Sequence, residues 1–103
     1  MAFNVSLEMT DKDIAKITLS GDLDGSVAPE FKTEIENAVA QNAKRLVLLM
    51  QDLGYMSSAG LRVLVFAKQK MGSDVDIYVV GAQEQVMEPI IMTGLRHSLV
   101  ILD

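Results

Sequence analysis

The feature that most constrains the fold is a change of hydrophobic period along the chain. From Phe3 to Met9, apolar side chains alternate with polar ones, and the segment 15–19 repeats the alternation after a polar turn at 11–13. A period of two is typical of half-buried strands, and two such strands joined by a short polar turn predict a β-hairpin. Gly21 is expected to end the second strand.

The period then changes to that of a helix. Apolar side chains from Phe31 to Val39 recur at helical spacing. Ser26 is a candidate cap for this helix, and Pro29 fits its first turn, where the missing N–H has no helical partner in any case. The following segment, 45–50, is apolar without alternation, which predicts a strand in the centre of the sheet.

The second half of the chain continues to alternate strands and helices. The loop 52–60 links the central strand to a second helix, which runs from about Ser58 to Met71 and is stopped by Gly72. Pro89 removes a hydrogen bond from the third helix at a cost of about 3 kcal/mol, so that helix is expected either to kink or to begin later. The remaining elements are a strand at 75–79, a helical segment at 84–93 and a short strand at 99–102.

Together these elements predict an α/β fold in the order β-β-α-β-α-β-α-β. Strand-helix-strand units cross over in a right-handed sense, so about five strands are expected to form a mixed, mostly parallel sheet with helices packed on it. A length of 103 residues suits one small domain, and we expect residues 1–103 to form it.

The composition excludes several kinds of site. With 14 acidic and 9 basic residues the formal net charge is -5, and no run of lysine or arginine occurs, so direct binding of nucleic acid is disfavoured. The absence of cysteine excludes a disulfide framework and a thiolate metal site, and a single histidine excludes a multi-histidine metal centre. We therefore expect no metal and no cofactor.

Nothing in the sequence resembles a membrane segment or an export signal. The N-terminus lacks a basic stretch followed by a long apolar run. The longest apolar stretch, 46–50, falls far short of the roughly 18 to 20 residues that cross a bilayer. These features predict a cytoplasmic protein that does not bind a membrane.

Ser57 and Ser58 lie at the start of the second predicted helix and have two compatible interpretations. Either serine can cap the helix, because its hydroxyl accepts a backbone N–H for roughly 1 kcal/mol. A serine at this position is also well placed to carry a phosphate, because the positive end of the helix dipole and the free N–H groups favour negative charge.

A catalytic interpretation of the same serines is weaker. Ser58, Ala59 and Gly60 match the second half of the nucleophile elbow G-x-S-x-G, but Met56 stands where the first glycine is required. The chain is also too short for a complete hydrolase, and its single histidine, His97, lies in the polar lead-in to the last strand. We therefore expect no enzymatic activity.

The helix that follows the serines is apolar around most of its circumference. Leu61, Leu64 and Val65 lie along one stripe, and Val63 and Phe66 extend the apolar surface to other sides. One sheet cannot cover every side of such a helix. It is either enclosed within the domain or exposed in part as a contact surface for another protein.

Five segments together carry a family pattern. They are Gly-Asp-Leu-Asp at 21–24, Ala-Pro-Glu at 28–30, Leu-Val-Leu-Leu at 46–49, Tyr-Met-Ser-Ser-Ala-Gly-Leu-Arg-Val-Leu at 55–64, and Met-Thr-Gly-Leu at 92–95. In order and spacing, these segments resemble the bacterial anti-sigma factor antagonists of the STAS family. The resemblance covers nearly the whole chain, and its most specific part runs from Ser57 to Leu64.

The resemblance implies a partner-switching function. Proteins of this family bind an anti-sigma factor that is also a serine kinase, and thereby release the sigma factor for transcription. The kinase phosphorylates a serine at the start of the second helix, the phosphoprotein dissociates, and a PP2C-type phosphatase resets the cycle. By resemblance, Ser58 is the phosphorylated residue. Ser57 stands where the family usually has aspartate, and it is the alternative acceptor.

The resemblance also implies a partner-binding face around the serine pair. Asp22 and Asp24 lie before the first helix, where they either form a polar turn or contact the partner. The expected face comprises Asp22, Asp24, Gly25, Met56, Ser57, Ser58, Arg62, Val63 and Phe66.

A different class of function is the alternative. The same type of domain can bind a nucleotide or another small ligand, or serve as a regulatory subunit of a transporter, because helix N-termini can hold phosphates. The sequence has no glycine-rich phosphate loop with its lysine, which argues against a nucleotide.

Overall fold

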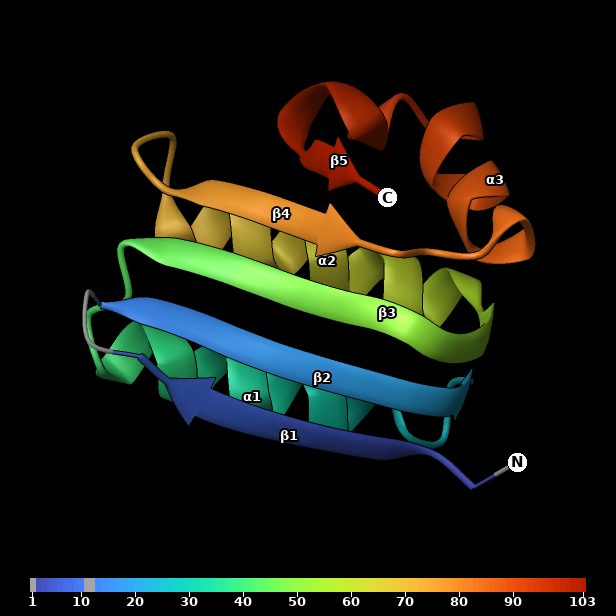
Figure 1. The fold of residues 1–103 in the computed structure, drawn as a ribbon, viewed down its shortest axis with the longest axis horizontal. Coiled ribbons are helices and arrows are strands. Elements are labelled where there is room, and N and C mark those ends of the chain that lie inside the picture. Colours follow the sequence, from blue (N-terminus) through green and yellow to red (C-terminus); the bar gives the residue numbers. More distant parts are fainter. Residues whose placement is uncertain (1, 11–12) are drawn as a thin grey trace.

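The computed structural model describes residues 2–10 and 13–103. Its strands are β1 (Asn4–Met9), β2 (Ile14–Leu23), β3 (Arg45–Met56), β4 (Asp76–Val80) and β5 (Val100–Leu102). They form one sheet in the order β1-β2-β3-β4-β5 (Figure 1). β1 pairs antiparallel with β2 and the three later pairs are parallel, which confirms the predicted sheet. Asp11 and Lys12 of the predicted hairpin turn lie outside the described residues.

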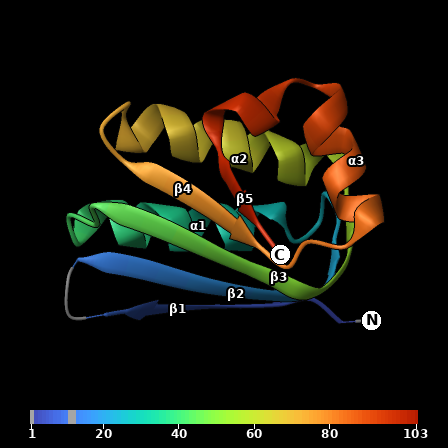
Figure 2. The same cartoon turned by 45° about the horizontal axis from the view of Figure 1, so that its top comes forward.

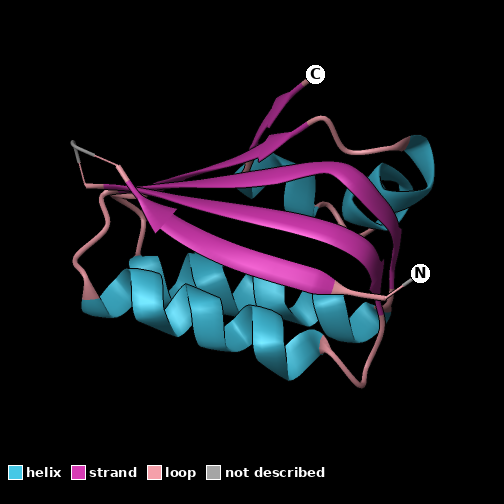
Figure 3. Cartoon of the chain, turned by 60° about the horizontal axis from the view of Figure 1, so that its bottom comes forward, coloured by secondary structure: helices cyan, strands magenta, loops and turns pink. Residues whose placement is uncertain are grey.

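The helices are unevenly distributed around the sheet. α1 (Ala28–Ala40) and α2 (Ser58–Met71) lie side by side under one face (Figure 3). α3 (Glu84–Met92) and the 3₁₀ helix η1 (Leu95–Ser98) connect β4 to β5 and lie at that edge of the sheet (Figure 1 and Figure 2). The element order is therefore the predicted β-β-α-β-α-β-α-β, with one added 3₁₀ turn. None of the described helices is long and apolar enough to cross a bilayer.

The alternation of the strands builds the core between the sheet and the helices. Ile17 and Leu19 of β2 and Leu48 of β3 are fully buried, as are Phe31 and Ile35 of α1. Each such side chain stabilises the fold by about 1.5–3 kcal/mol through its removal from water. The described part of the chain buries no polar or charged residue, so the layer between the sheet and the two helices α1 and α2 is packed by apolar side chains.

Gly21 does not end β2, as the sequence predicted, but lies inside it. Its φ of +86° and the register shift between Gly21 and Asp22 mark a bulge, and a side chain there would collide with the backbone of Ala2. Glycine adopts this backbone conformation at little cost, so the strand bends instead of stopping. β2 consequently reaches Leu23, beside the start of α2.

The central strand is also longer than predicted, and the expected loop at 52–60 is wrong. β3 continues to Met56 and pairs with β2 as far as Leu23. On its other side β4 pairs only as far as Leu49. Beyond that point the side-chain amides of Gln83 and Gln85 donate hydrogen bonds to backbone carbonyls of β3, over 2.9 Å and 3.2 Å.

Ser26 is not the cap of the first helix. The N-cap of α1 is Val27, which makes no side-chain capping bond. The Ser26 hydroxyl instead donates to Oδ1 of Asp24 over 2.6 Å. The prediction is wrong because the helix begins one residue later than a Ser26 cap requires, and the Ser26 hydroxyl donates to Asp24 instead of accepting a helix N–H.

Both bounds of the second helix and the start of the third are confirmed. α2 runs from Ser58 to Met71 and Gly72 is its C-cap. Pro89 lies inside α3, which begins at Glu84, so a later start, one of the two alternatives for this helix, is excluded. Val86 and Ile90 are fully buried, and two such side chains, at about 1.5–3 kcal/mol each, offset the roughly 3 kcal/mol that an interior proline costs. Several element ends differ from prediction by one residue: α3 ends at Met92, β4 runs from Asp76 to Val80 and β5 begins at Val100.

Candidate functional site

The start of α2 gives the two serines different roles. Ser57 is the N-cap, and its Oγ accepts a hydrogen bond from the Gly60 N–H over 3.4 Å. Its own N–H donates to the Leu23 carbonyl over 2.8 Å, which ties the helix start to the end of β2. Ser57 is half-buried, whereas Ser58, the first residue of the helix, is exposed. The hydroxyl of Ser58 is therefore the more accessible of the two.

Close packing holds this helix start in place. Gly60 is buried, and a Cβ at that position would lie 2.8 Å from side-chain atoms of both Leu23 and Met56. No real Cβ contact is that short, so glycine allows the first turn of α2 to rest directly on the ends of β2 and β3. Met56 itself is only 4% exposed, and it packs under the first turn of α2.

The loop between β2 and α1 runs beside the start of α2. Oδ1 of Asp24 accepts hydrogen bonds from the Ser26 N–H over 2.9 Å and from the Ser26 hydroxyl. These bonds, the side-chain bond first, lower the pKa of Asp24 from its usual value. The nearest side-chain atom to a Cβ built at Gly25 is the Cβ of Ala59, at 4.0 Å, so the loop lies against α2.

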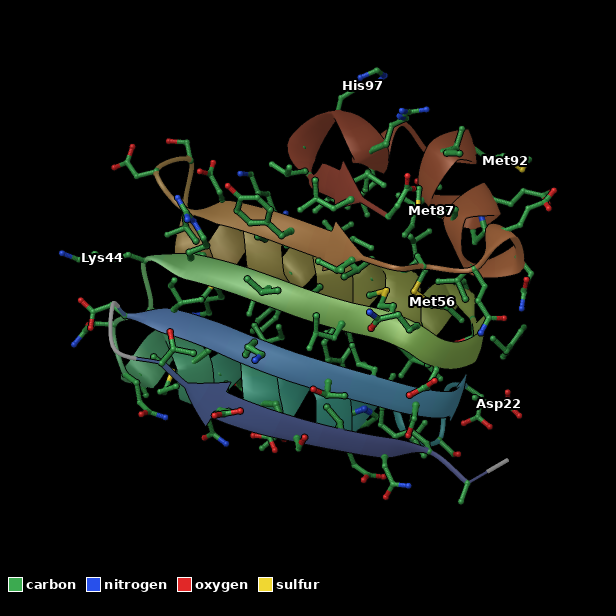
Figure 4. The ribbon with its side chains drawn as sticks, in the orientation of Figure 1. Asp22, Lys44, Met56, Met87, Met92 and His97 are labelled. Carbon is green, nitrogen blue, oxygen red and sulfur yellow. The ribbon has the colours of Figure 1, made fainter. Side chains whose placement is uncertain are left out.

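Asp22 lies at the same end of the molecule. It belongs to the last part of β2, and its Oδ1 lies 3.6 Å from a Cβ built at Gly54 of β3. Figure 4 shows Asp22 and Met56 toward one end of the sheet and Lys44 at the opposite end. The ends of β2 and β3, the following loop and the α2 start thus share one region of the protein.

A groove of about 410 Å³ lies between α1 and α2. The Nζ of Lys32 on α1 lies 4.7 Å from the centre of the Phe66 ring on α2, so a cation–π contact bridges the two helices. The lining residues are Gly25, Ala28, Pro29, Lys32, Ala59, Arg62, Val63 and Phe66.

The groove gathers four of the predicted partner-binding residues and adds others that the sequence did not single out. Gly25, Arg62, Val63 and Phe66 were predicted. Lys32 was not, because its inclusion depends on how α1 and α2 pack against each other. The sequence provided only a weak indication that Lys32 belongs to the groove. Lys32 follows Ala28 by one helical turn and lies next to the buried stripe of α1.

α2 is partly enclosed and partly exposed, so the expectation that the domain encloses the whole helix is wrong. Gly60, Val63, Leu64 and Ala67 are buried. Val65 is 40% exposed, and Arg62 is exposed as well. The helix therefore presents one side to solvent along its length.

The described residues do not assemble a hydrolase site at the serine pair. His97 is exposed on η1, and Figure 4 places it beyond the β4 edge, away from Met56, which directly precedes the serines. Within the described ranges, no cluster of three or more His, Cys, Asp or Glu side chains could hold a metal ion. The features that the structure brings together near the α2 start are an exposed hydroxyl, the carboxylates of Asp22 and Asp24, and a groove lined by Lys32 and Arg62.

This geometry defines a small α/β domain in which one helix presents an exposed serine at its first residue, next to a second helix and the end of the sheet. Residues 7–102 match the family model of the STAS domain, and the chain belongs to this family. The predicted family resemblance is thereby confirmed.

One relative comes from Mycobacterium tuberculosis. The anti-sigma-F factor antagonist RsfB is 28% identical to this chain over 85 residues, which are 82% of this chain and 70% of that protein. An anti-sigma factor antagonist from Mycobacterium paratuberculosis has a similar crystal structure, with a TM-score of 0.88 at 24% identity, over 98% of this chain and 86% of the other.

A further similar protein has been solved in two states. The anti-sigma factor antagonist SpoIIAA in its unphosphorylated form superposes with a TM-score of 0.82 at 18% identity, over 95% of this chain and 87% of the other. The Bacillus cell fate determinant SpoIIAA in its phosphorylated form has a TM-score of 0.75 at 18% identity, over 95% and 90%. At such low identity these structures establish a shared fold.

Proposed function

We propose that this chain is an anti-sigma factor antagonist, a non-enzymatic binding protein controlled by phosphorylation of Ser58. When Ser58 is unphosphorylated, the chain binds an anti-sigma factor that is also a serine kinase; phosphorylation releases it, and a PP2C-type phosphatase restores the binding form. One observation carries the proposal: Ser58 is exposed at the first residue of α2, while its neighbour Ser57 is half-buried and capped onto Gly60. The setting of such a switch is the cytoplasm.

The names of the similar proteins support this role. RsfB is named as an anti-sigma-F factor antagonist, and SpoIIAA is known in phosphorylated and unphosphorylated forms. The chain shares the fold of these proteins and has a serine at the first residue of α2.

A phosphate at Ser58 fits the physical requirements of a switch. It adds about -1.5 to -2 charges at pH 7, and the helix N-terminus stabilises them, so the domain does not need to refold. Arg62 follows Ser58 by four residues on the same helix, at the spacing at which side chains meet. Within the described part of the chain the guanidinium of Arg62 makes no hydrogen bond or ion pair, so it is available to the phosphate. An ion pair between phosphorylated Ser58 and Arg62 would make Arg62 unavailable to a bound partner.

The proposed binding face surrounds the acceptor. Asp22 and the Asp24–Gly25 loop lie on one side of the α2 start, and Arg62 and Phe66 extend the face along the groove. Met56 and Val63 are only 4% and 6% exposed, so their contribution is to shape this face.

Incubation with a cognate anti-sigma factor kinase and Mg-ATP tests the proposal. Mass spectrometry is expected to find phosphate on Ser58 in the wild type and in Ser57→Ala, and none in Ser58→Ala, which should bind the kinase constitutively. Ser58→Asp should weaken binding by about tenfold or more, equivalent to about 1.4 kcal/mol.

Ser73→Asp is the matched control, because it adds the same charge at an exposed position beyond the other end of α2. This variant should bind the kinase like the wild type. The proposal fails if neither serine is phosphorylated and Ser58→Asp binds unchanged. Calorimetry with GTP and ATP, set beside calorimetry with the kinase, measures the nucleotide-binding alternative directly.

A further inference from the structure

The groove between α1 and α2 differs in charge from the rest of the protein. The chain carries a net charge of -5, yet the groove is lined by two cations, Lys32 and Arg62, and by no carboxylate. The rest of its lining is apolar, chiefly Ala59, Val63 and Phe66. A cationic rim around an apolar floor selects an occupant of opposite charge with an apolar side chain.

Both rim cations are available to an occupant. Lys32 and Arg62 are exposed, and within the described residues neither is paired with a carboxylate. The one contact that involves them is the stacking of Lys32 on Phe66, which leaves the ammonium hydrogens free to bind an acceptor. An incoming carboxylate would therefore displace no existing ion pair.

The size of the groove suits a side chain of a partner protein. About 410 Å³ lies in the lower part of the range for binding pockets and is sufficient for one large apolar side chain with its immediate neighbours. Apolar anchors that fill such pockets dominate the energy of protein interfaces, and surrounding charges set orientation and specificity.

We propose that this groove is the anchor site for the partner, and that it takes an apolar side chain flanked by acidic residues. The inference rests on the proposed function, because it names the chemistry of the partner that Ser58 controls. It also accounts for release: a phosphate on Ser58 lies one helical turn from Arg62, so it neutralises one rim cation and repels the acidic segment.

A second copy of this chain is the competing occupant. The exposed surface of α3 carries Ile91 and Met92, which are 46% and 77% exposed, next to Glu84 and Glu88. This surface is itself apolar and acidic. The experiment must therefore separate self-association from capture of another protein.

The test is an NMR titration of the ¹⁵N-labelled chain with three blocked peptides, Glu-Asp-Leu-Glu-Asp, Lys-Lys-Leu-Lys-Lys and Glu-Asp-Gly-Glu-Asp. Only the first peptide has both the charge and the apolar anchor. It should give saturable shifts at the amides of Ala59 and Val63 and at the Phe66 ring, and the other two should bind at least tenfold more weakly.

Variants locate the effect in the groove. The double variant Lys32→Gln, Arg62→Gln should weaken binding of the first peptide at least tenfold. Lys44→Gln, Lys70→Gln removes the same charge at exposed positions that do not line the groove, and it should bind unchanged. Equal losses in the two double variants would leave only a general charge effect and would overturn the proposal.

Three other results would also contradict it. The first is a wild type that binds all three peptides equally or none. The second is inorganic phosphate reproducing the same shifts at the same concentration, which would indicate a simple anion site. The third is concentration-dependent shifts at Met92 and the groove in the free protein, which would indicate self-association through α3. Failure to bind any anti-sigma factor kinase would instead remove the proposed function, so the two failures remain distinguishable.

Discussion

α1 and α2 lie side by side, but they begin in contrasting ways. The start of α2 is fixed by a side-chain cap from Ser57 and by the contact of Gly60 with Leu23 and Met56. The start of α1 has no side-chain cap, and an exposed turn built by Asp24 and Ser26 precedes it. The start of α2, which presents the proposed acceptor Ser58, is therefore anchored to the sheet. The start of α1 follows an exposed turn and has no comparable anchor.

The largest difference in stability that this contrast predicts is between substitutions at two glycines. Gly60→Val should lower the free energy of unfolding by about 2–3 kcal/mol, because the added side chain overlaps Leu23 and Met56. Gly25→Ala, in the turn before α1, should change it by less than about 0.5 kcal/mol, because its nearest neighbour is Ala59 at 4.0 Å. Urea unfolding of both variants measures the difference. Equal losses would contradict the idea that α2 is the more tightly seated helix.

Ser57 and Ser26, which lie at or near the starts of α2 and α1, allow a second comparison of stability between the two helix starts. Ser57→Ala should destabilise the protein by about 1 kcal/mol, since the Gly60 N–H loses its acceptor at the half-buried start of α2. Ser26→Ala should cost less, because the Ser26 hydroxyl is exposed and caps no helix. Thermal unfolding of the two variants compares them. The expected order would be reversed if the Asp24 turn were the more important anchor.

The smallest effect is a pH dependence at the α1 turn. The Ser26 hydrogen bonds hold the pKa of Asp24 below the ordinary value of an aspartate, which is about 3.9. They therefore stabilise the folded state above that pH, and this stabilisation is lost as the pH falls through the folded-state pKa. Ser26→Ala should therefore raise the pKa of Asp24, measured by NMR titration of its side chain. The stability difference between this variant and the wild type should shrink below about pH 4. An unchanged Asp24 pKa would show that the hydroxyl bond is absent in solution.

The same contrast explains which parts of the molecule the sequence could predict. α2 was predicted to the residue because its start and stop signals are local: serines precede it and Gly72 follows it. The start of α1 was mispredicted because the N-cap is Val27, one residue later, and the Ser26 hydroxyl donates to Asp24 instead of accepting a helix N–H. The sequence pattern of a capping serine does not distinguish these two roles.

Long-range partners account for the remaining differences. β3 looked like a loop after Met50, but β2 pairs with it as far as Met56. On its other side, Gln83 and Gln85, which lie far along the chain, donate hydrogen bonds to two of its carbonyls. The groove likewise depends on the meeting of Lys32 with Phe66 across two helices. The serine pair, by contrast, could be identified from its position before a helical pattern.

The two glutamines that bond to the end of β3 also bear on whether another strand can add to this edge of the sheet. Past Leu49 this strand has lost β4 as a neighbour, and unpaired carbonyls on such an edge can recruit a strand from another molecule. The amides of Gln83 and Gln85 occupy the carbonyls of Gln51 and Gly54 instead. Strand addition is thereby blocked next to the surface on which the protein is proposed to bind, so that recognition there depends on side chains and not on an open backbone edge.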